Sequence, residues 1–262
     1  MLKKLLKYDL KWCYKPLIVF YILALILAVF TRIIEQFEKG LIFLILDKIC
    51  SGVLIAMLIN ILINNFIRIW VRFIRNLYKD ESYLTHTLPV SKNRIYVSKI
   101  VTTIITMFTS AIVIIACLAI VCVRKDTWDV LKASMEQTAL YFESSVSSLL
   151  IVIIITIFCQ MLFAIFSGFM GIMIGHRANN WKLIKSILIG LLCYIIPSMV
   201  TFGVIYGIGM VNPEVMKLFT TVSFSTEALK TILFTGIVMY ILYDILYYII
   251  GRKILEKGVN VD

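Results

Sequence analysis

Few side chains in this chain of 262 residues are of the types that carry out catalysis or bind metal ions. Only two histidines occur, His86 and His176, and no His-Glu-x-x-His pattern is present. The six cysteines include no Cys-x-x-Cys pair, which is the spacing typical of zinc and redox sites. No glycine is followed by lysine, so the phosphate-binding loop of an ATPase is missing. We therefore expect a chain that is not an enzyme and holds no cofactor or metal of its own.

Asp244 is the only carboxylate within an apolar stretch long enough to cross a membrane. Facing lipid, it would cost at least about 2.5–3.5 kcal/mol, so it should face the protein, a partner or water. Tyr240 and Tyr247 share about the same helical face and can offer hydroxyl groups to this intramembrane polar site. Two interpretations stay open: a substrate or proton site, or a hydrogen-bonded structural group. The position of Asp244, seven residues before Gly251, favours the structural group.

The segment 68–99 combines basic, acidic and apolar residues. Basic residues recur every three or four positions at its start, which predicts that a helix continues beyond the membrane: Arg68, Arg72, Arg75 and Lys79. Pro89 disfavours helix at Leu88, and Ser91 is a plausible N-cap for the next helix. We expect a helix, a compact turn and a second helix, which is either a simple connection or a docking surface.

The composition places these residues in a membrane protein. Hydrophobic side chains make up 61% of the chain and charged ones 16%, with a mean hydropathy of +0.97. Soluble domains contain about 45–50% apolar and about 25% charged residues. A chain of this size could not bury the excess apolar surface in its own core. A soluble globular enzyme and a disordered chain are therefore both excluded.

Stretches of about 20 apolar residues predict an all-α membrane protein with six transmembrane helices. The predicted spans are 16–34, 49–67, 100–123, 147–174, 186–210 and 231–250, within a transmembrane domain of 16–251 and before a tail of 252–262. An even number of spans leaves both termini on one side. That side carries 18 of the 26 lysines and arginines, so we expect both termini in the cytoplasm. The net charge of +11 then reflects cytoplasmic loops and no nucleic-acid partner.

Residues 1–15 predict an amphipathic helix. Lysines 3, 4, 7, 11 and 15 fall on one side and apolar residues on the other, as in helices that lie in the membrane interface. Pro16 would allow a bend into the first span. The alternative is a merely basic, frayed N-terminus. Asp9 lies within the apolar face, where it can contact another part of the bundle.

Small residues and a proline predict how the later spans pack. The patterns Gly171-x-x-x-Gly175 and Gly203-x-x-x-Gly207 permit close helix contact. Pro197 should bend the fifth span. Residues 211–230 are only weakly polar for an outside loop, which favours a short interfacial or re-entrant segment.

The order of these parts resembles that of ABC-2-type transporter permeases of Gram-positive bacteria. The specific likeness is the segment Asp-Glu-Ser-Tyr-Leu-Thr-x-Thr-Leu-Pro-Val-Ser-Lys at residues 80–92, within 79–99. In that family this loop carries the coupling helix, which meets the ATP-binding subunit. The resemblance implies that the following residues form or support this contact: Asp80, Glu81, Tyr83, Leu84, Thr87, Leu88 and Pro89.

The resemblance also implies a function. The chain would be the membrane-spanning permease subunit of an ATP-driven exporter in the cell membrane, moving a peptide or amphipathic compound. A second permease copy, identical or homologous, and two ATP-binding subunits would complete it, with ATP and Mg bound by those subunits. The alternative is a non-transporting membrane scaffold or sensor subunit. A membrane enzyme would need clustered histidine or nucleophile groups that this sequence lacks.

Overall fold

The computed structural model describes residues 2–37, 40–79, 81–122, 125–221 and 225–258. Within these ranges the chain is helical and has no strands. Six helices are long and apolar enough to cross a membrane: α1 (Leu2–Ile34), α2 (Leu41–Leu77), α4 (Lys92–Cys122), α6 (Val146–Gly175), α7 (Lys182–Val211) and α9 (Thr226–Glu256). The shorter elements are η1 (Glu35–Phe37), α3 (Ser82–Thr87), α5 (Lys125–Tyr141) and α8 (Pro213–Thr220). The predicted all-helical fold with six apolar spans is confirmed.

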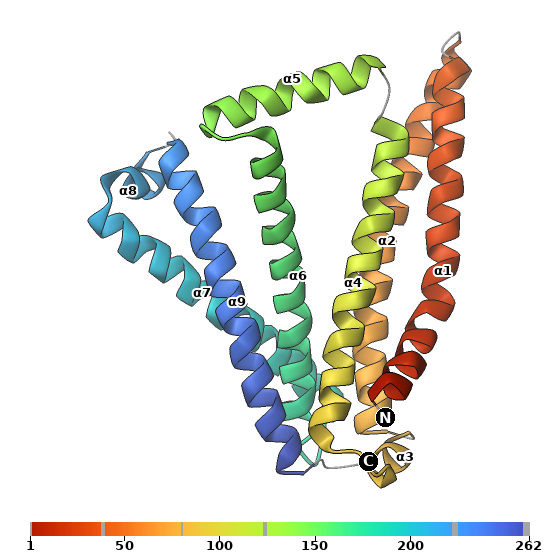
Figure 1. Cartoon of the computed structure of the whole chain (residues 1–262), viewed down its shortest axis with the longest axis vertical. Helices are drawn as coiled ribbons and strands as arrows, with labels where there is room; N and C mark the ends of the chain where they lie inside the picture. The colour runs from red at the N-terminus through yellow and green to blue at the C-terminus, as the bar shows by residue number, and fades with distance from the viewer. Residues whose placement is uncertain (1, 38–39, 80, 123–124, 222–224, 259–262) are drawn as a thin grey trace. The chain divides into compact units, whose positions relative to one another are not determined.

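The chain divides into two compact units, Met1–Val130 and Leu131–Asp262, and each contains three of the long helices. In the first unit, α1 packs along both α2 and α4, and α3 lies against α2 (Figure 1). The apolar core joins residues at three- and four-residue intervals on α1 to α2 and α4: Leu17, Tyr21, Ala24, Ala28, Leu54, Leu58, Ile61 and Cys117. This spacing is that of one helical face.

Helix α1 is continuous over 33 residues, with Pro16 inside it. The sequence predicted an interfacial helix over 1–15 followed by a span over 16–34, and the structure joins the two without a break in the helix. Asp9, Cys13 and Leu17 are buried at four-residue intervals, so both halves of α1 present one continuous face to the unit. The lysines at 3, 4, 7, 11 and 15 are exposed. The membrane-interface position of this segment stays a prediction.

The segment between α2 and α4 contains the short helix α3 and a turn. Helix α2 continues to Leu77, ten residues beyond the predicted end of its span. Helix α3 ends at Thr87, and Leu88 is extended, with φ −63° and ψ 138°, as expected before Pro89. Helix α4 then begins directly after Ser91.

In the second unit, α6 packs against α7 and α9, and α8 lies against α7 and α9 (Figure 1). The α6–α7 contact is close because Gly171 and Gly175 face Ser186 and Gly190. A Cβ atom added at Gly171 would lie 2.5 Å from the Gly190 Cα atom. Close packing is therefore found at Gly171-x-x-x-Gly175, the first of the two predicted patterns.

Helix α8 occupies part of the segment predicted to be short and interfacial. The Asn212 side chain accepts a hydrogen bond from the Glu214 backbone N–H at 2.9 Å and so caps the helix. Pro213 holds the first helical position, where its missing N–H is no loss. Helix α8 itself packs on α7 and α9.

The glycine contact can be tested with a matched pair of variants. Gly171→Ala should lower the free energy of unfolding by about 1–3 kcal/mol, because its methyl group would collide with the α7 backbone. Gly203→Ala should cost nothing, since no atom lies within 4 Å of the added carbon. Denaturant unfolding of the protein purified in detergent measures both. If both variants lost the same free energy of unfolding, the contact between Gly171 and Gly190 would not explain the cost of a side chain at residue 171.

Candidate functional site

Asp9 is the centre of a buried polar site in the first unit. Only 3% of the residue is exposed. Its Oδ1 atom accepts hydrogen bonds from Arg72 Nε at 2.9 Å and from Lys99 Nζ at 2.6 Å. Its Oδ2 atom accepts one from Ser98 Oγ at 3.0 Å. The carboxylate of α1 therefore joins a cation of α2 to a cation of α4.

Glu81 extends this site to α3. It directly precedes that helix, and its Oε2 atom accepts hydrogen bonds from Arg72 Nη1 at 2.6 Å and Asn76 Nδ2 at 2.5 Å. Lys99 Nζ also donates to Asn76 Oδ1. Arg72 thus bridges the two carboxylates. We call the connected residues the Asp9 cluster: Asp9, Arg72, Asn76, Glu81, Ser98 and Lys99.

An aromatic ring covers the cationic side of the Asp9 cluster. The guanidinium carbons of Arg68 and Arg72 lie 5.6 Å and 5.4 Å from the centroid of the Trp12 ring. Both distances are within the range of cation–π attraction. Trp12 follows Asp9 by three residues on α1, so one helical turn supplies both the carboxylate and the ring. The face of α1 that carries Asp9 therefore packs against the face of α2 that carries Arg68 and Arg72.

The charges of the six residues in the Asp9 cluster balance, and the exposed Arg75 lies outside it, with its Nε atom 3.9 Å from Glu81 Oε1. Two carboxylates, Asp9 and Glu81, meet two cations, Arg72 and Lys99, of which Lys99 is 6% exposed. Burying separate charges costs several kcal/mol for each ion, so they are stable here only as pairs. Removing one partner of such a pair costs about 3–5 kcal/mol, because it leaves the other charge uncompensated. The cluster therefore fixes how the four helices meet.

The residues predicted to contact an ATP-binding subunit fall into two groups. Tyr83 and Leu84 are 68% and 72% exposed on α3, and Leu88 is 42% exposed. Thr87 and Pro89 are exposed as well. Glu81 instead turns inward to Arg72 and Asn76, so its carboxylate already has partners within the chain. Asp80 and the His86 side chain lie outside the described residues.

Sequence reasoning missed three of the six members of the Asp9 cluster. Asp9 was expected to contact the bundle, but Asn76, Ser98 and Lys99 were not predicted as site residues. Two signals could have pointed to the pairing. Asp9 interrupts the apolar face of a lysine-rich helix, and Lys99 directly precedes an apolar stretch. Each is a charge in an environment that favours burial, and their signs are opposite.

A second group of polar side chains, away from the Asp9 cluster, also joins α1, α2 and α4. Asn65 of α2 is fully buried and donates to Thr106 O at 3.0 Å and to Ser110 Oγ at 2.8 Å on α4. The Tyr21 hydroxyl of α1 lies 2.7 Å from Ser110 Oγ. Interhelical hydrogen bonds of this kind hold spans together where apolar burial gives no preference between neighbours. They extend the polar contacts of α1, α2 and α4 into the apolar region.

Asp244 lies on α9, and its Oδ1 atom is buried with no hydrogen-bond partner in the part of the chain that the structure describes. The Tyr247 hydroxyl donates its proton to the Cys193 carbonyl oxygen at 2.5 Å. The Tyr240 ring packs on Phe163, with centroids 5.4 Å apart. The predicted tyrosine partners therefore serve contacts with other helices. Whether Asp244 is a proton or substrate site or a structural group stays a prediction.

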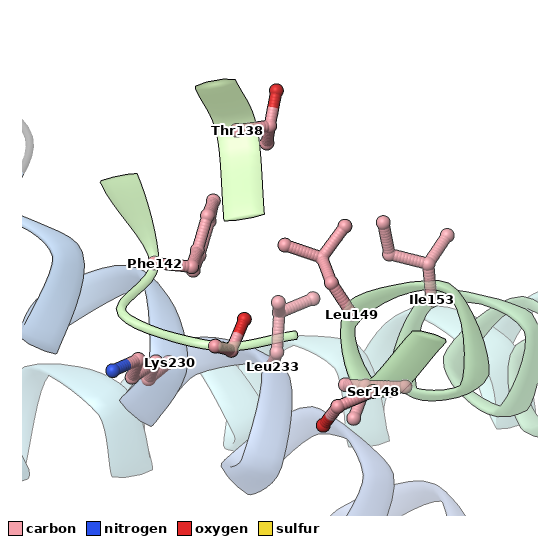
Figure 2. A pocket seen from close by; sticks show the side chains of 9 residues that line it. Thr138, Phe142, Ser148, Leu149, Ile153, Lys230 and Leu233 are labelled. Atoms are coloured by element: carbon pink, nitrogen blue, oxygen red, sulfur yellow. The ribbon is translucent and has the colours of Figure 1, made fainter. Parts of the chain in front are cut away.

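A hollow of about 240 Å³ lies in the second unit, lined by residues from the end of α5 and from the first turns of α6 and α9. Figure 2 shows the side chains around it. Phe142, Leu149, Ile153 and Leu233 give it apolar walls, and Lys230 also lines it. Sites for drug-sized ligands usually measure about 300–1,000 Å³, so this hollow can take only part of such a molecule.

Across the ranges that the structure describes, no three His, Cys, Asp or Glu residues are grouped to hold a metal ion. The chemistry that the Asp9 cluster offers is charge pairing between helices. No model of a known protein family, no curated protein and no solved structure matches this chain.

The pairing of Asp9 with Lys99 can be measured in a double-mutant cycle. Lys99→Met and Asp9→Asn should each lower the free energy of unfolding by about 3–5 kcal/mol, because each leaves a buried charge without one of its partners. The double variant should lose clearly less than the sum, since both charges are then gone. Denaturant unfolding in detergent provides the values. The control is Lys7→Met, at an exposed lysine of α1, the helix that carries Asp9. It should change the free energy of unfolding little. Strictly additive losses would contradict the pairing.

Proposed function

We propose that this chain is the membrane-spanning permease subunit of an ATP-driven ABC exporter. The observation that carries the proposal is the arrangement of α3, a short helix with exposed apolar residues. Glu81 attaches it to Arg72 and Asn76 of α2, and these two residues connect onward to α1 and α4. The resemblance of residues 80–92 to the coupling segment of ABC-2-type permeases supports the same function. ATP and Mg would be bound by two partner subunits, beside a second permease copy.

The attachment of α3 explains how a force could be transmitted. A helix of six residues is not stable in isolation, so its position depends on contacts with the rest of the unit. Glu81 connects its start to Arg72 and Asn76 of α2, and Arg72 connects onward to Asp9 of α1. A partner that moves α3 would therefore pull on α1, α2 and α4 together through short ion pairs.

The surface of α3 suggests the character of the partner site. Tyr83 and Leu84 would supply buried area in a groove with apolar walls, as aromatic and leucine side chains do at the centre of interfaces. Leu88 and Pro89 would extend this contact. Glu81 would not contact the partner. It would hold α3 in position through its hydrogen bonds to Arg72 and Asn76. Substrate class follows from the resemblance alone, and we propose a peptide or another amphipathic compound.

We place both termini and α3 in the cytoplasm, because 18 of the 26 basic residues fall on that side. In a background without the six native cysteines, a cysteine at residue 87 should resist an impermeant thiol reagent in intact cells. A cysteine at residue 134 should react. Both positions are exposed on the protein, so accessibility reports the side of the membrane. Labelling at 87 and not at 134 would show that the chain has the opposite orientation in the membrane. Helix α3 would then lie outside the cell, where it could not contact an ATP-binding subunit.

The double variant Tyr83→Ala with Leu84→Ala should fold normally, since both side chains are exposed. It should uncouple the reconstituted complex, so that an amphipathic peptide substrate no longer stimulates ATP hydrolysis and transport falls at least about tenfold, the effect of losing about 1.4 kcal/mol. The measurement is ATP turnover with and without substrate.

Leu140→Ala with Tyr141→Ala is the matched control, because these neighbours are also an exposed leucine and tyrosine, 77% and 52% exposed. It should retain stimulated turnover. Normal stimulation in the α3 variant would remove this helix from coupling. A complex that assembles with an ATPase but never transports would favour the scaffold alternative.

A further inference from the structure

Helix α7 contains a proline at a point where its backbone needs a donor. Pro197 lies inside the helix and has no N–H group, so the carbonyl oxygen of Cys193, four residues earlier, loses its helical hydrogen bond. In a membrane-spanning helix no bulk water can replace that bond, and an unsatisfied carbonyl is costly. The structure should therefore provide another donor at this position.

Helix α9 supplies that donor. The Tyr247 hydroxyl donates to the Cys193 carbonyl oxygen at 2.5 Å. One turn away, the Tyr243 hydroxyl donates to the carbonyl oxygen of Pro197 itself at 3.0 Å. The two tyrosines are four residues apart on α9, and the two carbonyls are four residues apart on α7, so the helical repeats match. The interrupted turn of α7 is thus hydrogen-bonded to a neighbouring helix.

Helix α6 holds these tyrosines in place. Phe163 is fully buried, and its ring stacks on that of Tyr247 with centroids 6.0 Å apart. The centroid of the Tyr243 ring lies 5.5 Å from the centroid of the Phe163 ring. Aromatic pairs at such distances contribute attraction beyond the burial of area. Because of this packing, each hydroxyl is directed at a set carbonyl and is not free to turn away.

The two halves of α7 are packed differently on either side of Pro197. Before the proline, Ser186 and Gly190 lie against Gly171 and Gly175 of α6, with backbone atoms in close contact. After the proline, no atom lies within 4 Å of a Cβ added at Gly203 or Gly207. In Figure 1 α7 diverges from α6 toward its C-terminal end. The first half is thus attached tightly to α6, and the second half packs on α8, where a Cβ atom added at Gly209 would lie 3.4 Å from the Met216 Cα atom.

We propose that Pro197 is a hinge in α7 whose angle is set by α9 through Tyr247 and Tyr243. With both hydroxyl bonds formed, α7 keeps the geometry seen in the structure. When the Tyr247 bond is broken, the half of α7 after Pro197, together with α8, swings relative to α6. This device does not depend on the proposed export function.

The experiment uses spin labels on the full-length protein in lipid nanodiscs. One label pair is placed at Ile151 of α6 and Met210 of α7, beyond the hinge, and a second pair at Gln160 and Leu188, before it. Tyr247→Phe should shift and widen the distance distribution of the first pair and leave the second unchanged. It should also lower the unfolding temperature by about 2–4 °C, because a buried carbonyl loses its partner.

Two further variants decide between the hinge and a general loss of packing. Tyr240→Phe is the matched control, because its ring also packs on Phe163 and its hydroxyl has no hydrogen-bond partner among the described residues. It should change neither distance pair. Pro197→Ala restores the backbone donor to Cys193, so it should narrow the first distribution and reduce the effect of Tyr247→Phe. An unchanged distribution in Tyr247→Phe, or the same effect with and without Pro197, would overturn the proposal.

Discussion

A carboxylate inside an apolar helical bundle needs cations to balance it, and the first unit is organised around that requirement. Asp9 receives Arg72 from α2 and Lys99 from α4 within hydrogen-bonding distance. Because Arg72 also binds Glu81, the position of α3 depends on the same charge. Each ion is stable in its buried position only while the others are present. The four helices are therefore held in one arrangement by a single connected set of charges.

In the second unit, small residues and aromatic rings form the main contacts between helices. Glycine and serine allow α6 and α7 to approach closely at one end, and Phe163 gathers tyrosines of α7 and α9 near the middle. Small residues and aromatic stacking provide contact without buried charge, which suits helices surrounded by lipid. The contacts described thus differ between the units. Ion pairs join the helices of the first, and small residues and stacked rings join those of the second, which also holds the buried Asp244 Oδ1 atom.

The membrane explains why backbone and side-chain donors are matched so closely in both units. In the absence of water, a carbonyl freed by proline or an amide on an apolar helix face must find a partner in the protein. Tyr247 satisfies the Cys193 carbonyl, and Ser110 and the Thr106 carbonyl accept hydrogen bonds from the Asn65 Nδ2 atom. These contacts choose particular helix neighbours where apolar burial alone would allow many.

The sequence by itself determined the all-helical class and the number of helices long and apolar enough to cross a membrane, because the length of an apolar stretch and its flanking charges are local properties. It also determined the turn before α4, through Pro89 and Ser91, and that Asp9 lies on a face made for contact. Only the tertiary structure decided which groups meet. Asp9 and Lys99 are 90 residues apart, Asp9 and Arg72 are 63 apart, and Tyr247 and Cys193 are 54 apart. Helical periodicity shows which face of a helix is buried, whereas the partner on that face depends on how separate helices cross, and no local pattern records that choice.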